Sequence, residues 1–262
     1  MANLEEALLL KNFKHSEKYF SLLVLAPKLV SMAGPGQFVQ IKCDDKFDPF
    51  LRRPISIHHL NQQEGLIEFL IEKKGKGTAW LSGRNAGDRL DLLGPLGKGF
   101  TLKNVPALLV GGGIGVAPLL ALGVALKEKG NAPTTLLGAN SHQEILKLTD
   151  FLAVSQRVQI ATVDGSMGKQ GLVTDLLIRE LESGFTGYIY TCGPEPMLRA
   201  VADIASKYSV SGEASLEANM ACGFGVCLGC TCNHKKADET YIHVCVDGPV
   251  LPLEVLVSND DY

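Results

Sequence analysis

The stretch from residue 217 to residue 232, EANMACGFGVCLGCTC, holds three cysteines in the pattern C-x4-C-x2-C. They are Cys222, Cys227 and Cys230, and the later run Tyr241–Val246, which we predict as a strand, adds Cys245. This is the plant-type spacing of a [2Fe–2S] cluster, in which a compact loop supplies three thiolates and a separate segment supplies the fourth. The glycines between the cysteines permit positive φ, so backbone N–H groups can turn toward the cluster sulfides.

Two alternatives remain open for these thiols. Structural zinc is usually held by paired C-x2-4-C units, and a triplet followed by a distant single cysteine does not divide into such pairs. Cys232 is a surplus thiol that could replace Cys245 as the fourth ligand. We favour Cys245, because Cys230 and Cys232 would compete for the same side of the loop. The sequence therefore predicts a one-electron carrier with Cys222, Cys227, Cys230 and Cys245 as its metal ligands.

Composition excludes several classes of function. The chain has 262 residues, 46% of them hydrophobic, which is enough for two or three domains with buried cores. Its net charge of −3 gives no electrostatic argument for nucleic-acid binding. No apolar run approaches the about 18 residues that span a bilayer, and the acidic N-terminus lacks the basic region of a signal peptide. The seven cysteines therefore indicate metal or redox use in a soluble protein of the reducing cytoplasm.

Residues 1–100 read as a series of short strands separated by turns. Six such runs without a helical period between them predict an antiparallel β-barrel. The predicted strands are Ala7–Asn12, Tyr19–Leu25, Gln37–Lys42, Pro54–His58, Leu66–Glu72 and Arg89–Leu93.

Two features of this barrel suit a phosphate. Arg53 opens a strand, and its guanidinium can hold a diphosphate through two parallel hydrogen bonds. The segment Gly75–Thr78 leads from a strand into a short helix, whose free N–H groups can form an anion site. Each has an ordinary alternative, because Arg53 could be a solvated strand end and Gly75–Thr78 an N-capped helix after a hairpin turn. Together they indicate a bound dinucleotide.

Residues 101–210 change to an alternation of apolar strands and helices, which predicts a parallel α/β sheet. The predicted strands are Ala107–Val110, Thr134–Leu137, Val158–Val163 and Gly187–Cys192. The predicted helices are Leu119–Glu128, Gln143–Leu152, Gly171–Glu182 and Pro196–Lys207.

A glycine-rich turn follows the first of these strands and precedes the first helix. It contains Gly111, Gly112, Gly113 and Gly115. Strand, glycine-rich turn and helix is the layout in which backbone N–H groups meet a nucleotide diphosphate. Tight packing between strand and helix also selects glycine, so the turn alone is weak evidence. Asp164 ends another strand, and we expect it at the adenosine end of the nucleotide.

The motifs of the barrel resemble those of the ferredoxin–NADP reductase superfamily. They are Arg53-Pro54-x-Ser56, the helix start Gly77-Thr78 and the turn Leu93–Gly97. The resemblance implies that Arg53 and Gly77-Thr78 hold the FAD diphosphate and that Ser56 faces the isoalloxazine ring. Ile55 stands where many members carry an aromatic residue. The full set of FAD contacts implied in this way is Arg53, Pro54, Ile55, Ser56, Leu70, Ile71, Glu72, Gly77 and Thr78.

The same superfamily places a Cys-Gly-Pro motif beside the nicotinamide. Here the motif is Cys192-Gly193-Pro194, so the resemblance implies a catalytic position for Cys192 near the hydride path and a cofactor contact for Gly193. A small buried thiol is the ordinary alternative for Cys192. Members that use NADP tend to carry an arginine near the position of Asn140, where it pairs with the 2′-phosphate. The absence of that arginine predicts NAD as the co-substrate.

The order of modules is a flavin barrel at 1–100, a nucleotide domain at 101–210 and a cluster module at 211–262. In the last module we predict a polar connection at Ser209–Glu213 and a charged turn at Asn233–Thr240. Over essentially its whole length the chain resembles the electron-transfer subunits of NAD-linked dihydroorotate dehydrogenases.

The resemblance implies an oxidoreductase subunit of pyrimidine biosynthesis. Electrons would pass from the FMN of a dihydroorotate-oxidising partner through the [2Fe–2S] cluster and FAD to NAD⁺, in a heterotetramer of two plus two subunits. FAD belongs between the other centres, because nicotinamide exchanges a hydride, the cluster takes single electrons, and flavin can do both. Two other readings are a flavin subunit of a bifurcating NADH–ferredoxin or sulfur-reducing hydrogenase complex, and a redox sensor whose cluster passes no current.

Overall fold

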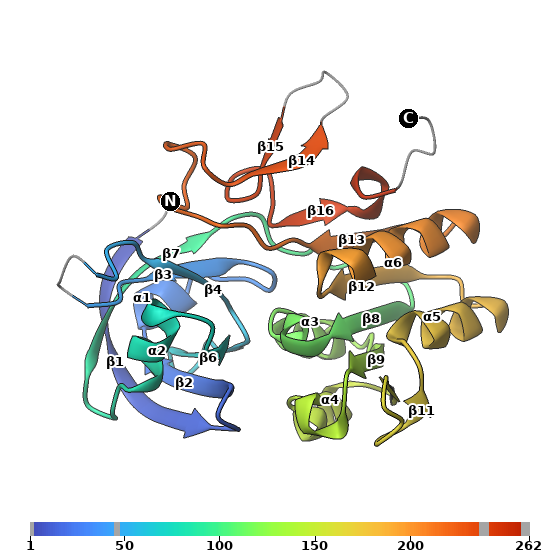
Figure 1. The fold of residues 1–262 in the computed structure, drawn as a ribbon, viewed down its shortest axis with the longest axis horizontal. Coiled ribbons are helices and arrows are strands. Elements are labelled where there is room, and N and C mark those ends of the chain that lie inside the picture. The colour runs from blue at the N-terminus through green and yellow to red at the C-terminus, as the bar shows by residue number, and fades with distance from the viewer. Residues whose placement is uncertain (1–2, 45–47, 236–240, 258–262) are drawn as a thin grey trace.

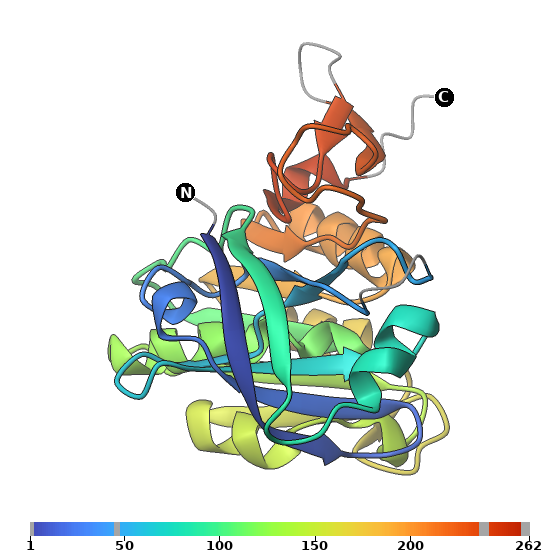
Figure 2. The same cartoon turned by 90° about the vertical axis from the view of Figure 1, so that its left-hand side faces the viewer.

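The structure is a computed structural model that describes residues 3–44, 48–235 and 241–257. Three parts make up the molecule (Figure 1): an antiparallel sheet that curls on itself, a parallel sheet with helices on its faces, and a small cysteine-bearing module. Figure 2 shows the same molecule from the barrel side, with the cysteine module standing above both sheets.

The N-terminal part is a seven-stranded antiparallel sheet in the order β4-β3-β7-β1-β2-β6-β5. Its strands are β1 (Asn3–Lys14), β2 (Tyr19–Leu25), β3 (Phe38–Ile41), β4 (Arg53–Ser56), β5 (His59–Asn61), β6 (Leu66–Glu72) and β7 (Arg89–Leu96). Two short helices, α1 (Pro27–Val30) and α2 (Lys76–Ser82), lie between strands. Apolar side chains that alternate along the strands fill the interior, among them the fully buried Leu22, Ile67 and Phe69.

The link between β4 and β5 closes the curl of this sheet. Ile57 donates its backbone N–H to Gln37 next to β3 at 3.0 Å, and His58 donates to Glu68 on β6 at 2.9 Å. One short segment is thereby bonded to both ends of the sheet, and the predicted antiparallel barrel is confirmed. The strand β5 was not predicted, because three residues of mixed character give no periodic signal.

The second sheet has the order β11-β10-β9-β8-β12-β13-β16, parallel except for the pairing of β13 with β16. Its strands are β8 (Ala107–Gly112), β9 (Thr134–Ala139), β10 (Arg157–Thr162), β11 (Lys169–Gln170), β12 (Tyr188–Cys192), β13 (Gly212–Ser215) and β16 (Val250–Pro252). The helices around it are η1 (Gly113–Val116), α3 (Leu119–Glu128), η2 (His142–Glu144), α4 (Leu148–Val154), α5 (Val173–Glu182), α6 (Glu195–Lys207) and η3 (Leu253–Val255).

Helices cover both faces of this sheet. Leu109 and Leu137 point into a core with α3 and α4, whereas their neighbours Leu108 and Leu136 point into a second core with α5 and α6. Burial on both faces explains why the strands β8 and β9 are apolar runs without alternation. The predicted α/β parallel-sheet domain is confirmed.

Two predicted elements of the α/β part are wrong. The helix expected over Gln143–Leu152 is split into η2 and α4, because Lys147 takes the left-handed conformation with φ of 56°. The polar connection expected over Ser209–Glu213 enters the sheet instead, since β13 pairs with β12 along Gly212–Ser215. The parallel sheet therefore draws strands from both sides of residue 210, and the domain limits 1–100, 101–210 and 211–262 stay a prediction.

The cysteine module contains a two-stranded hairpin, β14 (Thr231–Lys235) and β15 (Tyr241–His243). The strand predicted over Tyr241–Val246 is too long, because the N–H groups of Val246 and Asp247 both turn back to the His243 carbonyl at 2.9 Å. Cys245 thus lies in a turn and not on a strand. Of the turn predicted over Asn233–Thr240, the first three residues belong to β14, and residues 236–240 lie outside the described residues.

The module rests on the barrel through a small buried core. This core combines Phe38 of β3 and Leu96 of β7 with Val244, Cys230 and Cys245. In the part of the chain that the structure describes, none of the helices has both the length and the apolar character needed to cross a bilayer.

Candidate functional site

The four predicted cluster ligands lie in the cysteine module as two pairs. The sulfurs of Cys230 and Cys245 are 3.1 Å apart, and both residues are buried. Cys222 and Cys227 form the other pair, in which Cys227 donates its N–H to the Cys222 sulfur at 3.4 Å. Within the described ranges, no three His, Cys, Asp or Glu side chains gather around a point that one metal ion could occupy. Two pairs fit a [2Fe–2S] centre, because each of its two irons takes two thiolates.

The two pairs differ in electrostatic environment. Burial is the largest single influence on Cys222 and raises its pKa, but the backbone N–H groups of Cys227, Phe224 and Val226 together outweigh it and bring this pKa down to about 6. Burial and the adjacent Cys230 thiol raise the pKa of Cys245 to about 12. Inward N–H groups that stabilise a thiolate sulfur also suit the negative sulfides of a cluster.

The surplus cysteine, Cys232, belongs to neither pair, although it packs against the buried core that contains Cys230 and Cys245. Cys232 sits on β14 opposite Ile242, and its side chain helps to line the nucleotide cavity described below. The residue that the fold brings next to Cys230 is Cys245. This placement supports the ligand set predicted from the sequence, which stays a prediction for the loaded protein.

A cavity of about 370 Å³ lies along the barrel strands β4 and β6, and we call it the barrel cavity. Eight of the nine FAD contacts implied by the sequence line it, namely Arg53, Pro54, Ile55, Ser56, Leu70, Ile71, Glu72 and Thr78. They converge because β4 and β6 lie against each other where the barrel closes. The other wall comes from the α/β domain, with Ile114, Ala117 and Pro118.

The ninth residue, Gly77, contacts Arg53 directly. A Cβ atom at Gly77 would lie 2.5 Å from the Arg53 Nε, so only glycine leaves room for the guanidinium at the edge of the cavity. The Thr78 hydroxyl accepts N–H groups of Lys74 at 2.9 Å and of Gly75 at 3.2 Å. The N-capped turn is therefore present, and it places a guanidinium and a helix start beside one cavity. These residues fit an FAD diphosphate.

A second cavity of about 620 Å³, the nucleotide cavity, lies at the carboxyl ends of β8 and β12. The predicted contacts Gly112, Gly113, Gly115 and Gly193 all line it. Gly113 has a φ of 54°, a backbone conformation that glycine adopts more easily than other residues. No atom lies within 4 Å of its Cβ position, so the turn is open to a ligand on this side. Tight packing also operates here, since a Cβ atom at Gly115 would lie 2.5 Å from Gly193.

Three predicted nucleotide residues lie outside this cavity. Gly111 is buried in β8 and leaves room for Val116, so its role is packing. Asp164 sits in an exposed turn, where its carboxylate accepts the N–H of Ser166 at 2.9 Å and its hydroxyl at 2.6 Å. Cys192 is buried beneath the cavity, and burial together with the Glu217 carboxylate raises its pKa, so the thiol stays neutral.

A more apolar cavity of about 350 Å³ adjoins the nucleotide cavity and shares Gly112, Gly113, Asn140, Glu144 and Pro194 with it. Its remaining walls come from the starts of α5 and α6, including Val173 and Met197. The nucleotide cavity is the more polar of these two adjoining spaces, so the pair suits a dinucleotide with its adenine in the more apolar one.

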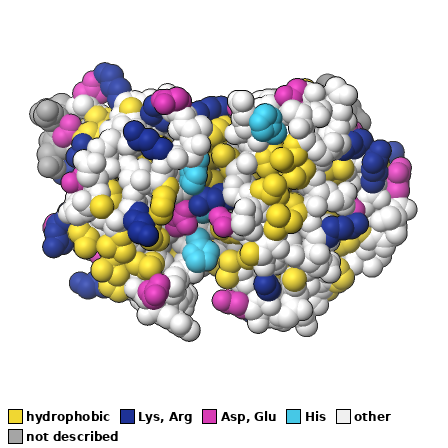
Figure 3. Space-filling model, turned by 90° about the horizontal axis from the view of Figure 1, so that it is seen from below, with side chains coloured by type: hydrophobic (Ala, Val, Ile, Leu, Met, Phe, Trp, Pro, Cys, Tyr) yellow, Lys and Arg dark blue, Asp and Glu magenta, His cyan; other side chains and the backbone are white. Residues whose placement is uncertain are grey.

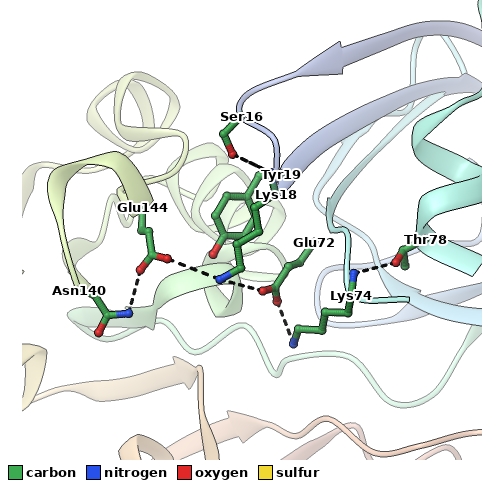
Figure 4. A network of polar contacts seen from close by, with 8 residues as sticks. All are labelled: Ser16, Lys18, Tyr19, Glu72, Lys74, Thr78, Asn140 and Glu144. Carbon is green, nitrogen blue, oxygen red and sulfur yellow. Dashed lines mark hydrogen bonds and ion pairs between the residues drawn. The ribbon is translucent and has the colours of Figure 1, made fainter. Parts of the chain in front are cut away.

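An ion-pair network that sequence reasoning missed crosses the nucleotide cavity (Figure 4). Lys18 of the barrel reaches Glu72 at 3.0 Å and Glu144 of the α/β domain at 3.5 Å. Lys74 also pairs with Glu72, at 2.8 Å, and Asn140 donates to Glu144 at 2.9 Å. No sequence pattern could have joined these residues, because the two ends of the Lys18–Glu144 pair are 126 positions apart.

The segment 216–219 also went unrecognised, although it lines both the barrel cavity and the nucleotide cavity. It follows β13 directly, and β13 runs parallel to β12, so the segment leaves the carboxyl edge of the sheet where ligands bind. That signal was missed because β13 itself was missed. Glu72, Lys74 and Ile114 also line both cavities, which are therefore neighbours with a common wall.

Comparison with known proteins agrees with this geometry. Residues 217–257 match the family described as the iron-sulfur cluster binding domain of dihydroorotate dehydrogenase B, and residues 109–203 match the oxidoreductase NAD-binding domain. The dihydroorotate dehydrogenase B (NAD(+)) electron transfer subunit of Bacillus caldolyticus is 40% identical over 90% of this chain and 91% of its own length. The subunit of the same name from Fusobacterium nucleatum is 40% identical over 82% of this chain and 84% of its own.

Solved structures agree on the architecture. The structure described as an NADH-dependent reduced ferredoxin–NADP oxidoreductase is 31% identical, with a TM-score of 0.84 over 95% of this chain and 89% of that one. The ferredoxin reductase of carbazole 1,9a-dioxygenase, at 23% identity and a TM-score of 0.68 over 80% of this chain, shares the fold. With a relative 40% identical over nine-tenths of its length, a matched iron–sulfur module and a matched NAD-binding domain, the chain belongs to the family of dihydroorotate dehydrogenase B (NAD(+)) electron transfer subunits.

Proposed function

We propose that this protein carries electrons from the FMN of a dihydroorotate-oxidising subunit, through a [2Fe–2S] cluster and FAD, to NAD⁺ in pyrimidine biosynthesis. The observation that supports this best is the common wall of the two cavities, formed by Glu72, Lys74, Ile114 and the segment 216–219. A flavin in the barrel cavity lies beside a nucleotide in the other cavity, and the cysteine module packs on the barrel strand β3.

The residues of the chain hold and order the three groups. Arg53 and the turn at Gly77-Thr78 hold the FAD diphosphate, while Pro54–Ser56 and Leu70–Glu72 line the ring. The glycine turn after β8 and Gly193 receive the NAD diphosphate. Flavin supplies the conversion between hydride and single electrons. The buried Cys192 thiol, which remains neutral, gives the nicotinamide end an apolar floor rather than a nucleophile.

The surface around the cysteine loop supports a protein partner. Phe224, Val226 and Leu228 of the loop are 51%, 74% and 58% exposed, and Val246 beside Cys245 is 45% exposed. Apolar side chains around a redox centre form the dry contact through which a partner can deliver single electrons. We place the FMN-containing catalytic subunit there, in a heterotetramer of two copies of each chain in the cytoplasm.

NAD is favoured over NADP at the nucleotide cavity. Asn140 occupies the position where NADP-using members tend to carry an arginine, and the adjoining carboxylate of Glu144 would repel a 2′-phosphate. We expect the ratio of kcat/KM for the two cofactors to favour NADH.

Co-expression with a dihydroorotate-oxidising, FMN-containing subunit tests the proposal. We expect a stable complex with flavin and [2Fe–2S] absorbance that reduces NAD⁺ when dihydroorotate is added. Flavin without iron, or four thiols that bind zinc alone, would refute it. If the complex instead couples NADH to ferredoxin, the bifurcating function holds, to which the 31% identical neighbour lends support. A redox sensor would show no NADH-dependent dye reduction.

A further inference from the structure

Strand β3 separates the barrel interior from the cysteine module. Val39 and Ile41 point inward and belong to the barrel core. Phe38, on the opposite face, belongs to the buried cluster that contains Cys230 and Cys245, and it also lines the barrel cavity. Gln40 lies on this same outward face, because side chains alternate along a strand.

The side chain of Gln40 contacts the beginning of the cysteine loop. It is completely buried, and its Nε2 lies 3.5 Å from the Ala221 carbonyl. A Cβ atom at Gly223 would lie 2.6 Å from the same Nε2 and 2.9 Å from the Gln40 Cγ, so the loop rests directly on the carboxamide. Ala221 and Gly223 flank Cys222, the first predicted ligand.

The carboxamide of Gln40 is not used to stabilise the barrel. Its Oε1 is buried and has no hydrogen-bond partner among the described residues. Leaving such an oxygen unpaired costs about 1–3 kcal/mol, so an apolar residue would serve the barrel alone better. Gln37, three residues earlier, shows the contrast, because its amide accepts from Gly34 at 2.9 Å and donates to Gly97 at 2.8 Å.

The strand beside β3 in the sheet, β4, lines the flavin site. Gln40 pairs with Pro54 of β4, and Pro54 lines the barrel cavity. Arg52 holds the Gln40 carbonyl at 3.4 Å and the Asp91 carboxylate through two bonds of 3.0 and 2.9 Å, which fixes the backbone of β3 at this position. The backbone of Gln40 is thus held beside β4, the strand that lines the barrel cavity, and its side chain contacts the loop that contains Cys222.

We propose that Gln40 is the positioning residue that ties the first cluster-binding turn, Ala221–Gly223, to the flavin barrel and so fixes the separation of cluster and FAD. The inference rests on the proposed function, because it requires both groups to be bound. The buried amide donates to the backbone of a loop that contains Cys222, whereas among the described residues it makes no bond within the barrel.

The test compares Gln40→Met, which keeps an unbranched side chain of similar size but removes both hydrogen-bonding groups, with Gln37→Met as the matched control. Iron and FAD per chain, the rate at which excess chelator bleaches the cluster absorbance, and the electron paramagnetic resonance spectrum and midpoint potential of the reduced cluster are measured. Rapid mixing with NADH separates reduction of FAD from reduction of the cluster.

For Gln40→Met we expect unchanged FAD content and FAD reduction, a shifted cluster signal and potential, slower cluster reduction, and cluster loss about fivefold faster, as for one lost hydrogen bond. Gln37→Met should leave all cluster properties at their wild-type values. If the two variants behave alike, or if Gln40→Met matches wild type, the inference is refuted while the proposed function stands. Wild-type protein that never binds iron would refute the proposed function and this inference together.

A second pair of variants approaches the contact from the loop. Gly223 has a φ of 81° and its Cβ would strike Gln40, whereas a Cβ at Gly229 meets only the Cys227 sulfur at an ordinary 3.6 Å. We expect Gly223→Ala to reproduce the cluster defects of Gln40→Met and Gly229→Ala to retain the wild-type signal. Equal cluster properties in the two alanine variants would overturn the assignment, even if Gln40→Met proved too unstable to purify.

Discussion

At the scale of single residues, the position of Arg53 beside the barrel cavity depends on a glycine, Gly77. Gly77 sits against the Arg53 side chain, and any Cβ atom there would overlap the Nε and Cζ atoms of the guanidinium. Gly75, two residues earlier in the same turn, has an extended backbone and no atom within 4 Å of its Cβ position. A side chain at Gly77 would therefore collide with Arg53, whereas a side chain at Gly75 would meet no other residue.

We expect Gly77→Ala to purify with less FAD than wild type, because the methyl group displaces the guanidinium that holds the diphosphate. A displaced charge-assisted bond of about 1.5–3 kcal/mol corresponds to at least a tenfold weaker FAD affinity. Absorbance after dialysis and titration of the apoprotein with FAD measure the effect. Gly75→Ala is the matched control and should retain FAD; similar loss in both variants would mean that the turn, and not Arg53, is disturbed.

A second residue, His58, is buried completely where the barrel meets the α/β domain. Its Nδ1 donates to the Ala117 carbonyl at 2.8 Å, and its Nε2 has no partner among the described residues. Burial lowers the pKa of His58 to about 4, against the opposing influence of the Ala117 bond and the Glu68 carboxylate. Because of this lowered pKa, the imidazole is neutral in the folded protein above about pH 4.

This lowered pKa predicts acid sensitivity. The unfolded chain takes up a proton at His58 near pH 6.5 and the folded chain only near pH 4, so stability is complete above 6.5 and falls as the pH drops through this window. The loss amounts to up to about 3 kcal/mol by pH 4. We expect His58→Asn, which keeps a donor for Ala117, to flatten the dependence of the urea midpoint on pH between 6.5 and 4. The control His59→Asn should keep the wild-type dependence of the urea midpoint on pH. If His58→Asn keeps the same dependence as this control, the prediction is wrong.

At the scale of secondary-structure elements, long apolar runs were predictable and short polar ones were not. The strands β2 and β6 and the helix α3 begin and end at the predicted residues, because each is a mostly apolar run of seven or more residues. The strands β5 and β13 have three and four residues, and they exist because neighbouring strands supply hydrogen bonds. Such partners are distant in the sequence and leave no local pattern.

The site followed the same rule. The cysteine spacing and the barrel motifs are local, so a set of residues could be predicted from them, and the structure brings these residues to the barrel cavity and to the paired thiols. Lys18, Glu144 and Gln40 come from elements that meet only in the folded chain, and their sequence neighbourhoods contain no motif. Asp164 was assigned from its place at a strand end, but its carboxylate is used within its own turn.

The break before α4 illustrates a tertiary contact that overrides helix propensity. Lys147 takes the left-handed conformation there, and its ammonium group reaches Glu68 of β6 at 2.6 Å with both side chains less than 20% exposed. Lys147 leaves the helical conformation, and in this position its side chain forms an ion pair that joins the α/β domain to the barrel.

We expect a double-mutant cycle of Lys147→Met and Glu68→Gln to show a coupling energy of about 1–3 kcal/mol in urea unfolding, because the pair is largely shielded from water. The exposed helix pair Arg199–Glu195, whose side chains are 38% and 66% exposed, serves as the control and should couple by less than about 0.5 kcal/mol. Additive effects at Lys147 and Glu68 would show that the two domains are held together by other contacts.

At the scale of the whole molecule, three parts meet so that the flavin site adjoins both the nucleotide site and the cysteine module. Seen from below, the barrel and the α/β domain form two lobes, with histidine, acidic and basic side chains gathered along the seam (Figure 3). The cysteine module lies on the opposite side, above both lobes (Figure 1). The barrel cavity adjoins both of the other sites, because it shares a wall with the nucleotide cavity and Phe38 links it to the buried core of Cys230 and Cys245.

This order predicts that the two halves of the electron path can be separated by one substitution. Cys227→Ser removes a thiolate from the exposed pair and should abolish the cluster, because an alcohol is a poor ligand for iron. Turnover with the dihydroorotate-oxidising partner should fall with it, while much of the direct NADH-to-dye activity remains, since NADH reaches FAD without passing the cluster. Cys232→Ser is the matched control: Cys232 belongs to neither thiol pair, so cluster absorbance and partner-linked turnover should both persist. Equal loss of both activities in Cys227→Ser would show that flavin and cluster do not act in series. Loss of the cluster in Cys232→Ser would show that Cys232, and not Cys245, is the fourth ligand.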